Sequence, residues 1–313
     1  MIVKRILITG ASGFIGGHLT RAALNAGYEV WAGVRSSSNT QKLEEQGIQL
    51  VVLNYDEEEI LYRQLAEIGT WDYVIHNAGV TKTIHKDDFY RVNHLYTERL
   101  VKALNKMQHP VEKFILMSSL GVYGPTAEKV NRGIRMDDPQ IPNSDYGKSK
   151  QLAEASVTEH ARMPYLICRP TGVYGPGDQD YFLMIKSVNQ GIDVATGFTP
   201  QRLSFIYVED LAKVIIELLD TNISQRAFFI DDGVMVTDTE FSSILKQLLK
   251  KKRVLRFRIP LCLVYLACQI IGTWGVLRNK AVTLNRDKYK ILKQRNWACE
   301  SDLKDVLTAE GKD

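Results

Sequence analysis

A tyrosine and a lysine near the middle of the chain have the spacing of an acid–base pair. Tyr146 and Lys150 are four residues apart in a segment predicted to be helical over 146–162, so their side chains share one face, one turn apart. A tyrosine hydroxyl has an ordinary pKa of about 10, and a neighbouring ammonium group lowers it by stabilising the phenolate. Tyr146 can then exchange a proton with a substrate hydroxyl or carbonyl while a nicotinamide carries hydride. The same spacing also arises by chance in many helices.

Two serines end the apolar segment 113–119, which is predicted to be a strand. Ser118 and Ser119 directly follow Met117. A hydroxyl at the carboxyl end of a parallel strand faces the ligand crevice, where it can hydrogen-bond a reacting oxygen. The alternative is that both serines only cap the turn that follows.

A glycine-rich loop near the N-terminus has the features of a dinucleotide phosphate site. It connects an apolar segment, 2–8, to a helix predicted over 14–26. Glycines in such a loop allow a tight turn, a close approach to a pyrophosphate and close packing of the helix, whose N-terminus supplies free N–H groups. A plain connection between a strand and a helix can carry the same glycines. The cofactor contacts predicted here are Gly10, Ser12, Gly13, Phe14, Ile15 and Gly16.

The end of the second predicted strand, 28–34, indicates which dinucleotide binds. NAD enzymes usually have an acidic residue here that hydrogen-bonds the ribose 2′-hydroxyl, whereas this chain has Arg35. A guanidinium group suits a 2′-phosphate because it offers paired donors and a permanent charge, and Lys42 can assist it. A solvated surface arginine is the alternative. We therefore expect NADP(H), with NAD(H) as the second possibility.

The elements that must position these groups alternate between strand and helix. This alternation predicts an α/β fold, a doubly wound parallel sheet of the Rossmann type. We predict a dinucleotide-binding domain over 1–170, rejoined by about 204–232. A smaller, mostly helical substrate-binding region comprises 171–203 and 233–313, and 120–145 and 171–203 are predicted to be long loops. The predicted strands are 2–8, 28–34, 48–53, 73–77, 113–119, 165–168, 205–208 and 227–230, and the predicted helices are 14–26, 41–46, 57–68, 89–107, 146–162 and 209–219.

Composition narrows the classes of partner. A net charge of +4 over 313 residues gives no argument for nucleic acid. The four cysteines show no C-x-x-C pair and no neighbouring histidine cluster, so we predict reduced thiols and no metal site. The chain passes directly from Met1 into a strand, so we expect a cytoplasmic protein without a signal peptide.

One apolar segment of the C-terminal third raises the question of a membrane. Residues 259–277 carry no charge, and this length can just span a bilayer. Basic residues on both sides, including the run 250–253, suit an anionic lipid surface. Pro260 and Gln269 lower its hydrophobicity, as do a threonine and two glycines. We therefore favour the alternative, a pair of helical pieces packed over the substrate crevice, over membrane association.

Taken together, the motifs resemble the extended short-chain dehydrogenase/reductase family, also called the NAD-dependent epimerase/dehydratase family. The resemblance covers residues 2 to about 220. It implies that Ser119 is the catalytic hydroxyl, that Tyr146 is the acid/base, and that Lys150 tunes Tyr146 and holds the nicotinamide ribose. The motifs are Thr9 to Gly16, His76-Asn77-Ala78-Gly79, Ser118-Ser119 before Val122-Tyr123-Gly124, Tyr146-x-x-x-Lys150, Arg169-Pro170 before Val173-Tyr174-Gly175-Pro176-Gly177, and Phe205 to Asp210.

The same resemblance implies further contacts. Asn93 matches a helix asparagine that lines the nicotinamide end of the cofactor site, and Ala78 is a further cofactor contact. Asp56 resembles the acid that contacts adenine, although it can also cap the helix that follows. Members of the family often dimerise through the helices predicted here at 89–107 and 146–162, which implies a homodimer. The candidate substrate contacts are Thr81, Ser119, Tyr174 and Arg202.

We expect the substrate to be a small molecule, and positions at which the sequence differs from the family pattern indicate its chemical class. Nucleotide-sugar epimerases commonly have an arginine where this chain has Leu203, with Arg202 one residue earlier. Residues 27–35 resemble NADP-using reductases of the dihydroflavonol type, and 282–288 with Trp297 resembles the tail of these and of steroid-dehydrogenase-like members. We therefore expect an NADP(H)-dependent oxidoreductase that interconverts a secondary alcohol and a carbonyl. The alternatives are a nucleotide-sugar epimerase or dehydratase with bound NAD, and a non-catalytic dinucleotide-binding protein.

Overall fold

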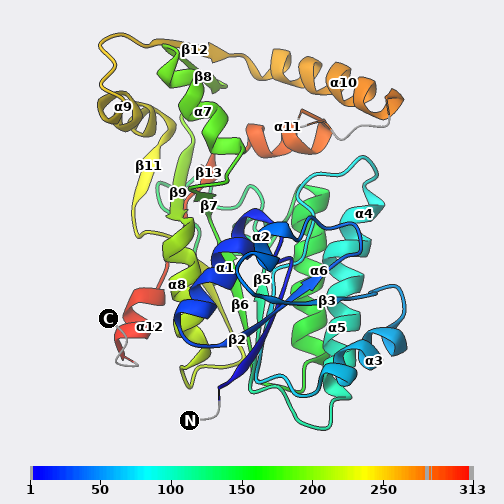
Figure 1. Ribbon diagram of the computed structural model, residues 1–313. Coiled ribbons are helices and arrows are strands. Elements are labelled where there is room, and N and C mark those ends of the chain that lie inside the picture. The colour runs from blue at the N-terminus through cyan, green and yellow to red at the C-terminus, as the bar shows by residue number, and fades with distance from the viewer. Residues whose placement is uncertain (1–2, 279–281, 283, 310–313) are drawn as a thin grey trace.

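A seven-stranded parallel sheet forms the centre of the protein (Figure 1). The structure, a computed structural model, describes residues 3–278, 282 and 284–309, so the outer ends of the predicted segments 1–170, 2–8 and 233–313 and part of 282–288 lie outside the described residues. The strands of this sheet are β1 (Arg5–Thr9), β2 (Glu29–Val34), β3 (Gln49–Val52), β4 (Tyr73–His76), β5 (Lys113–Met117), β6 (Tyr165–Pro170) and β10 (Arg226–Ile230). The predicted Rossmann-type sheet is confirmed.

The order of the strands determines where a ligand can bind. Across the sheet it is β10-β6-β5-β4-β1-β2-β3, so the chain builds outward from β1 to β3 and then returns to β4 on the other side of β1. The connections leaving the carboxyl ends of β1 and β4 therefore diverge, which opens a crevice between them. The glycine-rich loop follows β1 and the segment from Asn77 follows β4, so both meet at this crevice.

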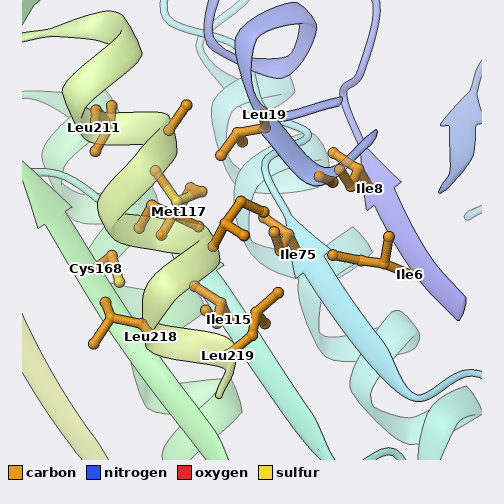
Figure 2. Close-up of a cluster of buried hydrophobic side chains, with 14 of the residues drawn as sticks. Ile6, Ile8, Leu19, Ile75, Ile115, Met117, Cys168, Leu211, Leu218 and Leu219 are labelled. Atoms are coloured by element: carbon orange, nitrogen blue, oxygen red, sulfur yellow. The ribbon is translucent and has the colours of Figure 1, made fainter. Parts of the chain in front are cut away.

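Helices cover both faces of the sheet. Successive residues of a strand point to opposite faces, and because both sets are apolar here, each face is buried under helices. Ile6 and Ile8 face one layer of helices, while Leu7 between them faces the other. Figure 2 shows the first of these layers, in which Leu19 and Leu211 pack over the sheet. Burying each side chain of this size contributes about 1.5–3 kcal/mol to the free energy of folding. The helices of the two layers are α1 (Phe14–Asn25), α8 (Val208–Leu219) and α12 (Leu303–Ala309) on one face, and α3 (Glu58–Ile68), α5 (Tyr96–Asn105) and α6 (Asp145–His160) on the other, with the short α2 (Gln41–Glu44) beside β3.

The helix predicted over 89–107 is not a single regular helix. It begins as α4 (Asp87–Phe89), continues as a π-helical segment (Tyr90–Leu95) and ends as α5. A π-helical turn holds more residues than an α-helical turn and so redirects the side chains within it. The spacing of the apolar residues in the sequence does not reveal this π-helical turn. Asn93 lies within it.

The segment 171–203, which we expected to be a long loop, contains regular structure. It holds β7 (Gly172–Tyr174), α7 (Asp180–Asn189), β8 (Ile192–Thr196) and the start of β9 (Arg202–Tyr207). The prediction of a loop is wrong because the partners of these strands are distant in sequence. For example, β8 pairs with β12 (Leu255–Ile259), so its stabilising contacts are not visible in a local window.

The C-terminal part forms a lobe at the end of the molecule away from the N-terminus (Figure 1). It is mainly helical, as predicted, with two small sheets that contain β11–β9–β13 with β7, and β12–β8. Its last helix, α12, returns to the central sheet and packs beside β10. The remaining elements of this part are β11 (Met235–Thr237), α9 (Asp238–Leu248), α10 (Leu261–Leu277), α11 (Arg286–Lys293) and β13 (Asn296–Trp297).

The apolar segment 259–277 forms one helix from Leu261 onward, α10, after Ile259 ends β12, and not the expected pair of helical pieces. It packs on α11, where Gly272 lies against the backbone of Asn285. In the described part of the chain, no helix has both the length and the hydropathy that crossing a membrane requires. The two glycines in the segment did not break the helix, because glycine inside a helix costs only about 1 kcal/mol relative to alanine.

Candidate active site

The glycine-rich loop has the backbone geometry of a phosphate site. Gly10 has a φ of 66°, and a Cβ built on it would lie 2.8 Å from the Ala78 backbone, so only glycine fits this turn. Gly16 packs directly on the loop, where a Cβ would overlap the Gly10 carbonyl. Helix α1 begins at Phe14, and among the described residues no side chain caps its first turn. Its N-terminal N–H groups are therefore available to a phosphate.

A cavity of about 370 Å³ runs from this loop to the catalytic candidates. Its volume lies in the range of small-molecule sites. Sequence reasoning missed the aromatic and apolar part of its wall, which includes Tyr55, Tyr96, Val80, Val92, Met117 and Pro170. The predicted residues that line it are Gly10, Ser12, Gly13, Phe14, Ile15, Arg35, Ala78, Thr81, Tyr146 and Lys150.

Ser119 and Tyr146 meet around Gly121. A Cβ built on Gly121 would lie 3.3 Å from the Ser119 Oγ and 3.7 Å from the Tyr146 ring. The Ser119 Oγ accepts a hydrogen bond from the Gly121 N–H at 3.1 Å, so the serine does cap the turn and is not only a candidate for chemistry. Desolvation by the surrounding protein raises the pKa of Tyr146, and a hydrogen bond with Ser119 lowers it. Both side chains can therefore address the same reacting oxygen.

Lys150 is buried one turn along α6 from Tyr146. Its Nζ donates a hydrogen bond to the Met117 carbonyl at 2.7 Å, which fixes the ammonium at the carboxyl end of β5. Burial lowers the pKa of Lys150 to about 8, and the nearby Glu154 carboxylate acts in the opposite direction. That Lys150 lowers the pKa of Tyr146 stays a prediction, because desolvation has the largest effect on that hydroxyl.

A buried polar network distinguishes the two adjacent serines. The Ser118 hydroxyl donates to Glu154 at 2.5 Å, and Glu154 forms an ion pair with Arg169 at 2.6 Å. Arg169 in turn donates to the Tyr123 hydroxyl at 2.9 Å. Ser118 is thus engaged in holding α6 against the sheet, which leaves Ser119 as the hydroxyl beside Tyr146. Sequence reasoning missed Glu154, although it continues the four-residue spacing of Tyr146 and Lys150.

Asn93 anchors the segment that follows β4. Its side chain accepts a hydrogen bond from the Val80 N–H at 2.8 Å and donates to the Val80 carbonyl at 3.0 Å. It also donates to the Ser149 hydroxyl at 2.9 Å, and it is almost fully buried. The π-helical segment makes this orientation possible. In the structure Asn93 therefore lies behind the wall of the cavity, next to Gly79 and Lys150.

A buried histidine ties β4 to β1 beneath the crevice. His76 shares hydrogen bonds with the hydroxyls of Thr9 at 2.8 Å and Thr97 at 3.0 Å. Burial lowers the pKa of His76 to about 3, and the positive charge of Lys150 adds to this effect. His76 is therefore neutral at physiological pH and serves to orient the strands.

The adenosine end of the predicted cofactor site is more open. Arg35 is exposed at the cavity wall, and its backbone N–H donates to the Ser38 hydroxyl at 3.1 Å. Lys42 lines an adjoining cavity of about 740 Å³ that shares Ser12 and Gly13 with the first. Asp56 does not cap α3, whose N-terminal cap position is Glu57, so that expectation is wrong. Instead its carboxylate accepts a hydrogen bond from Tyr96 at 2.9 Å.

The candidate substrate residues lie on different elements. Thr81 lines the cavity, while Tyr174 on β7 packs edge-on against Phe205. Arg202 on β9 donates to Asn131 at 3.1 Å and to the Ala127 carbonyl at 3.3 Å. In this structure Arg202 is therefore bound to the loop that follows Ser119.

Asp287 on α11 reaches the start of α6, the helix that carries Tyr146 and Lys150. Its carboxylate accepts a hydrogen bond from the Asp145 N–H at 2.9 Å and lies 3.5 Å from the Tyr146 N. A carboxylate at a helix N-terminus stabilises the unpaired N–H groups and the helix dipole. No signal in the sequence places Asp287 there, because the two segments are more than 140 residues apart.

Together the sheet order, the loop and the crevice define a Rossmann-type, dinucleotide-binding enzyme. A sequence profile of the NAD dependent epimerase/dehydratase family matches residues 6–230. The chain belongs to this family of NAD(P)-dependent enzymes, which includes extended short-chain dehydrogenases, epimerases and dehydratases.

Three similar proteins illustrate the range of the family. The UDP-glucose 4-epimerase of Vibrio cholerae is 28% identical over 250 residues, which cover 76% of this chain and 73% of that protein. The decarboxylating sterol-4-alpha-carboxylate 3-dehydrogenase of Dictyostelium discoideum is 26% identical over 320 residues, 96% of this chain and 94% of that protein. The structure of the UDP-glucuronic acid 4-epimerase from Bacillus cereus in complex with NAD has a TM-score of 0.67 at 24% identity, covering 82% of this chain and 86% of that one.

Proposed function

We propose that this enzyme is an NADP(H)-dependent oxidoreductase that interconverts a secondary alcohol and a carbonyl of a small-molecule substrate. The arrangement of Ser119 and Tyr146 around Gly121, with Lys150 held at the carboxyl end of β5, supports the proposal most directly. Tyr146 and Lys150 line the cavity, as does Ser118 in place of Ser119. The match to a sterol dehydrogenase extends over 96% of the chain, against 76% for the epimerase, and this favours a dehydrogenase. The longer match takes in the C-terminal lobe, which we propose holds the substrate.

The residues present fit a dinucleotide. The glycine-rich loop leaves room for phosphates against the free N-terminus of α1, and the cavity leads from there to Tyr146. When bound, the nicotinamide supplies hydride to the carbonyl carbon or accepts it from the alcohol carbon. In the reducing direction the Tyr146 hydroxyl gives its proton to the carbonyl oxygen, while the Ser119 hydroxyl hydrogen-bonds that oxygen. We propose that Lys150 holds the ribose and favours the tyrosinate that remains.

Two sequence-based expectations, the division into domains and the homodimer implied by the family resemblance, stay part of the proposal. The central sheet and α8 form the dinucleotide domain, and the segments 171–203 and 233–309 contribute most of the substrate region. A homodimer forms through α5 and α6, on which Leu152 is exposed and next to which Leu95 is exposed.

Removing the Tyr146 hydroxyl tests the catalytic part of the proposal. We expect Tyr146→Phe to lower kcat by roughly 10²–10⁴-fold, the usual contribution of a positioned proton donor, with unchanged dinucleotide affinity. Tyr62→Phe on α3 is the matched control and should keep parental activity. A fully active Tyr146→Phe enzyme would disprove the mechanism.

Reversing the charge at the end of β2 tests the choice of cofactor. We expect about tenfold tighter binding of NADPH than of NADH, and loss of this preference in Arg35→Asp, since a guanidinium pairs with the 2′-phosphate. Arg63→Asp, an exposed arginine on α3, is the control. Equal affinity of the parent enzyme for both dinucleotides, measured by titration of the cofactor fluorescence, would reject the role of Arg35.

An epimerase or dehydratase is the second candidate, because the chain is also similar to a UDP-glucose 4-epimerase. Such an enzyme reduces and reoxidises its cofactor within one turnover. It would therefore purify with tightly held NAD and show no net consumption of NADPH with carbonyl substrates. Either result in the parent enzyme would replace the first candidate with the second.

A further inference from the structure

Helix α10 carries a continuous apolar stripe on its exposed side. Its buried residues, among them Val264, Cys268 and Gly275, lie on a different side of the helix. Figure 1 shows α10 along the outer edge of the C-terminal lobe, with α11 beneath it. The stripe recurs every three or four residues and consists of Leu263, Leu266, Ile270, Trp274 and Leu277, which are 53%, 52%, 70%, 49% and 80% exposed.

The strand before α10 adds a second exposed apolar face. In the parallel pair of β8 and β12, Leu255 lies beside Ile192, and Phe257 lies beside Val194. All four side chains are exposed, whereas Asp193 between the two aliphatic residues of β8 is buried. The alternation along these strands therefore places their large apolar side chains outward, while Asp193, Ala195, Arg256 and Arg258 face inward.

All charged residues in the part of the chain that contains β12 and α10 are basic. Residues 241–286 contain no aspartate or glutamate. They include ten lysines and arginines, namely Lys246, Lys250, Lys251, Lys252, Arg253, Arg256, Arg258, Arg278, Lys280 and Arg286.

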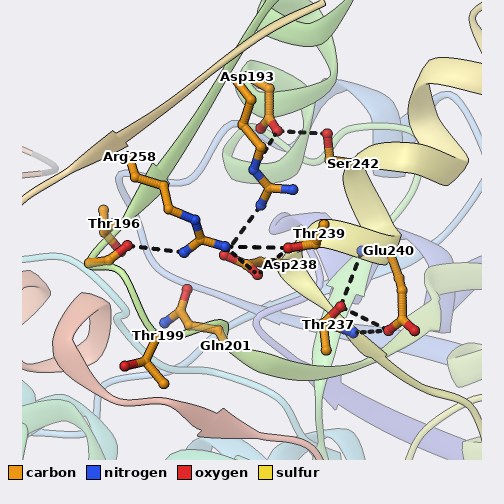
Figure 3. Close-up of polar contacts among 12 residues, drawn as sticks. Asp193, Thr196, Thr199, Gln201, Thr237, Asp238, Thr239, Glu240, Ser242 and Arg258 are labelled. Carbon is orange, nitrogen blue, oxygen red and sulfur yellow. Dashed lines mark hydrogen bonds and ion pairs between the residues drawn. The ribbon is translucent and has the colours of Figure 1, made fainter.

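Some of these charges are neutralised inside the lobe and others are not. Figure 3 shows Arg258 directed at Asp238, and Arg256 pairs with both Asp193 and Asp238. In contrast, Lys246, Lys250 and Lys251 line a shallow hollow of about 350 Å³ on the surface, and Lys252 and Arg253 are exposed. Within the described ranges none of these five has an acidic partner.

We propose that the C-terminal lobe docks on the surface of an anionic lipid bilayer. Helix α10 lies in the plane of the interface with its stripe among the acyl chains, and the unpaired lysines contact the lipid phosphates. Apolar side chains in a helix flanked by basic residues are the combination that an anionic bilayer surface binds. The absence of acidic side chains over this stretch gives charge complementarity to such a surface, and α10 does not need to cross it.

The docking surface is connected to the catalytic helix. On α10, the side-chain oxygen Oε1 of Gln269 accepts a hydrogen bond from the Arg286 Nε at 2.6 Å. The next residue, Asp287, accepts the hydrogen bond from Asp145 at the start of α6, next to Tyr146. Only α11 therefore separates a bilayer bound to α10 from the start of α6 and Tyr146.

Vesicle binding of the full chain tests the proposal. We expect co-sedimentation with vesicles of phosphatidylglycerol and phosphatidylcholine, at least about tenfold less with phosphatidylcholine alone, and a decrease with added salt. Leu266→Glu/Ile270→Glu should reduce binding to the anionic vesicles by about tenfold or more. The matched control is Val3→Glu/Val52→Glu, which alters exposed valines of the sheet domain and should bind as the parent does.

The charge requirement is tested separately. Lys250→Gln/Lys251→Gln/Lys252→Gln should weaken binding, while Lys129→Gln/Lys213→Gln/Lys304→Gln, which removes the same charge from other exposed positions, should not. Unchanged circular dichroism and thermal unfolding establish that each variant is folded. Equal vesicle binding by the parent and the α10 variant would overturn the proposal. So would sedimentation of the parent without vesicles as an oligomer that the α10 variant dissociates, since a second copy would then cover the stripe.

Discussion

The sheet domain and the C-terminal lobe differ in where their charged side chains lie. Beneath the active site, Glu154 and Arg169 are buried as an ion pair, and their remaining hydrogen-bonding atoms contact Ser118 and Tyr123. In the C-terminal lobe, lysines such as Lys252 are exposed, and apolar residues such as Ile270 face outward. The buried pair holds the surrounding side chains in one arrangement, because removing either partner would leave an uncompensated charge inside the protein. The lobe leaves surface for a partner to cover.

The difference predicts where substitutions affect stability. In the sheet domain, the free energy of unfolding should depend on single polar contacts. In the lobe, exposed side chains should alter binding without altering the fold. Measurements of unfolding free energy in variants of the two regions test this contrast.

Neutralising the buried carboxylate should have the largest effect. Glu154→Gln leaves the Arg169 guanidinium buried without a counter-charge, and we expect a loss of about 3–5 kcal/mol in the free energy of unfolding. The control is Asp302→Asn, which breaks the ion pair of Arg226 with Asp302, in which both side chains are more than 40% exposed. This change should cost no more than about 1 kcal/mol. Equal losses in urea unfolding would remove the distinction between the buried and the exposed pair.

The buried histidine should make the sheet domain sensitive to acid. Unfolded His76 binds a proton below pH 6.5, but the folded protein does so only near pH 3, so stability is lost as the pH falls through this window. Between pH 7 and pH 5 this group should contribute a loss of about 2 kcal/mol. His76→Gln should lack this part of the loss, whereas His85→Gln, at an exposed position, should retain it. Urea unfolding at both pH values measures the difference.

The smallest effect is expected on α10. Leu266→Glu/Ile270→Glu should change the free energy of unfolding by less than about 1 kcal/mol, because both side chains already face solvent. Truncating the buried Leu100 of α5 to alanine should cost about 2–5 kcal/mol by comparison. A large loss of stability in the α10 variant would mean that the stripe packs against protein, which would weaken the contrast between the two regions.

Local pattern was sufficient for much of the protein. The sequence alone indicated the alternation of strands and helices, the glycine-rich loop and the four-residue spacing of Tyr146 and Lys150, since each is a pattern of residues close together along the chain. It also located the apolar segment that became α10. It did not anticipate β8 within 171–203, because that strand is stabilised by β12, some 60 residues later.

Tertiary structure decided which of these residues come together and in what role. The family resemblance pointed to Ser119, but the contacts that separate the two serines come from the structure: Ser118 donates to Glu154, whereas Ser119 lies beside Tyr146. Asn93 lies behind the cavity because a π-helical turn redirects it, and Asp287 reaches α6 across more than 140 residues. These contacts join elements that are distant in sequence, and their energies depend on burial, which no short stretch of sequence encodes by itself.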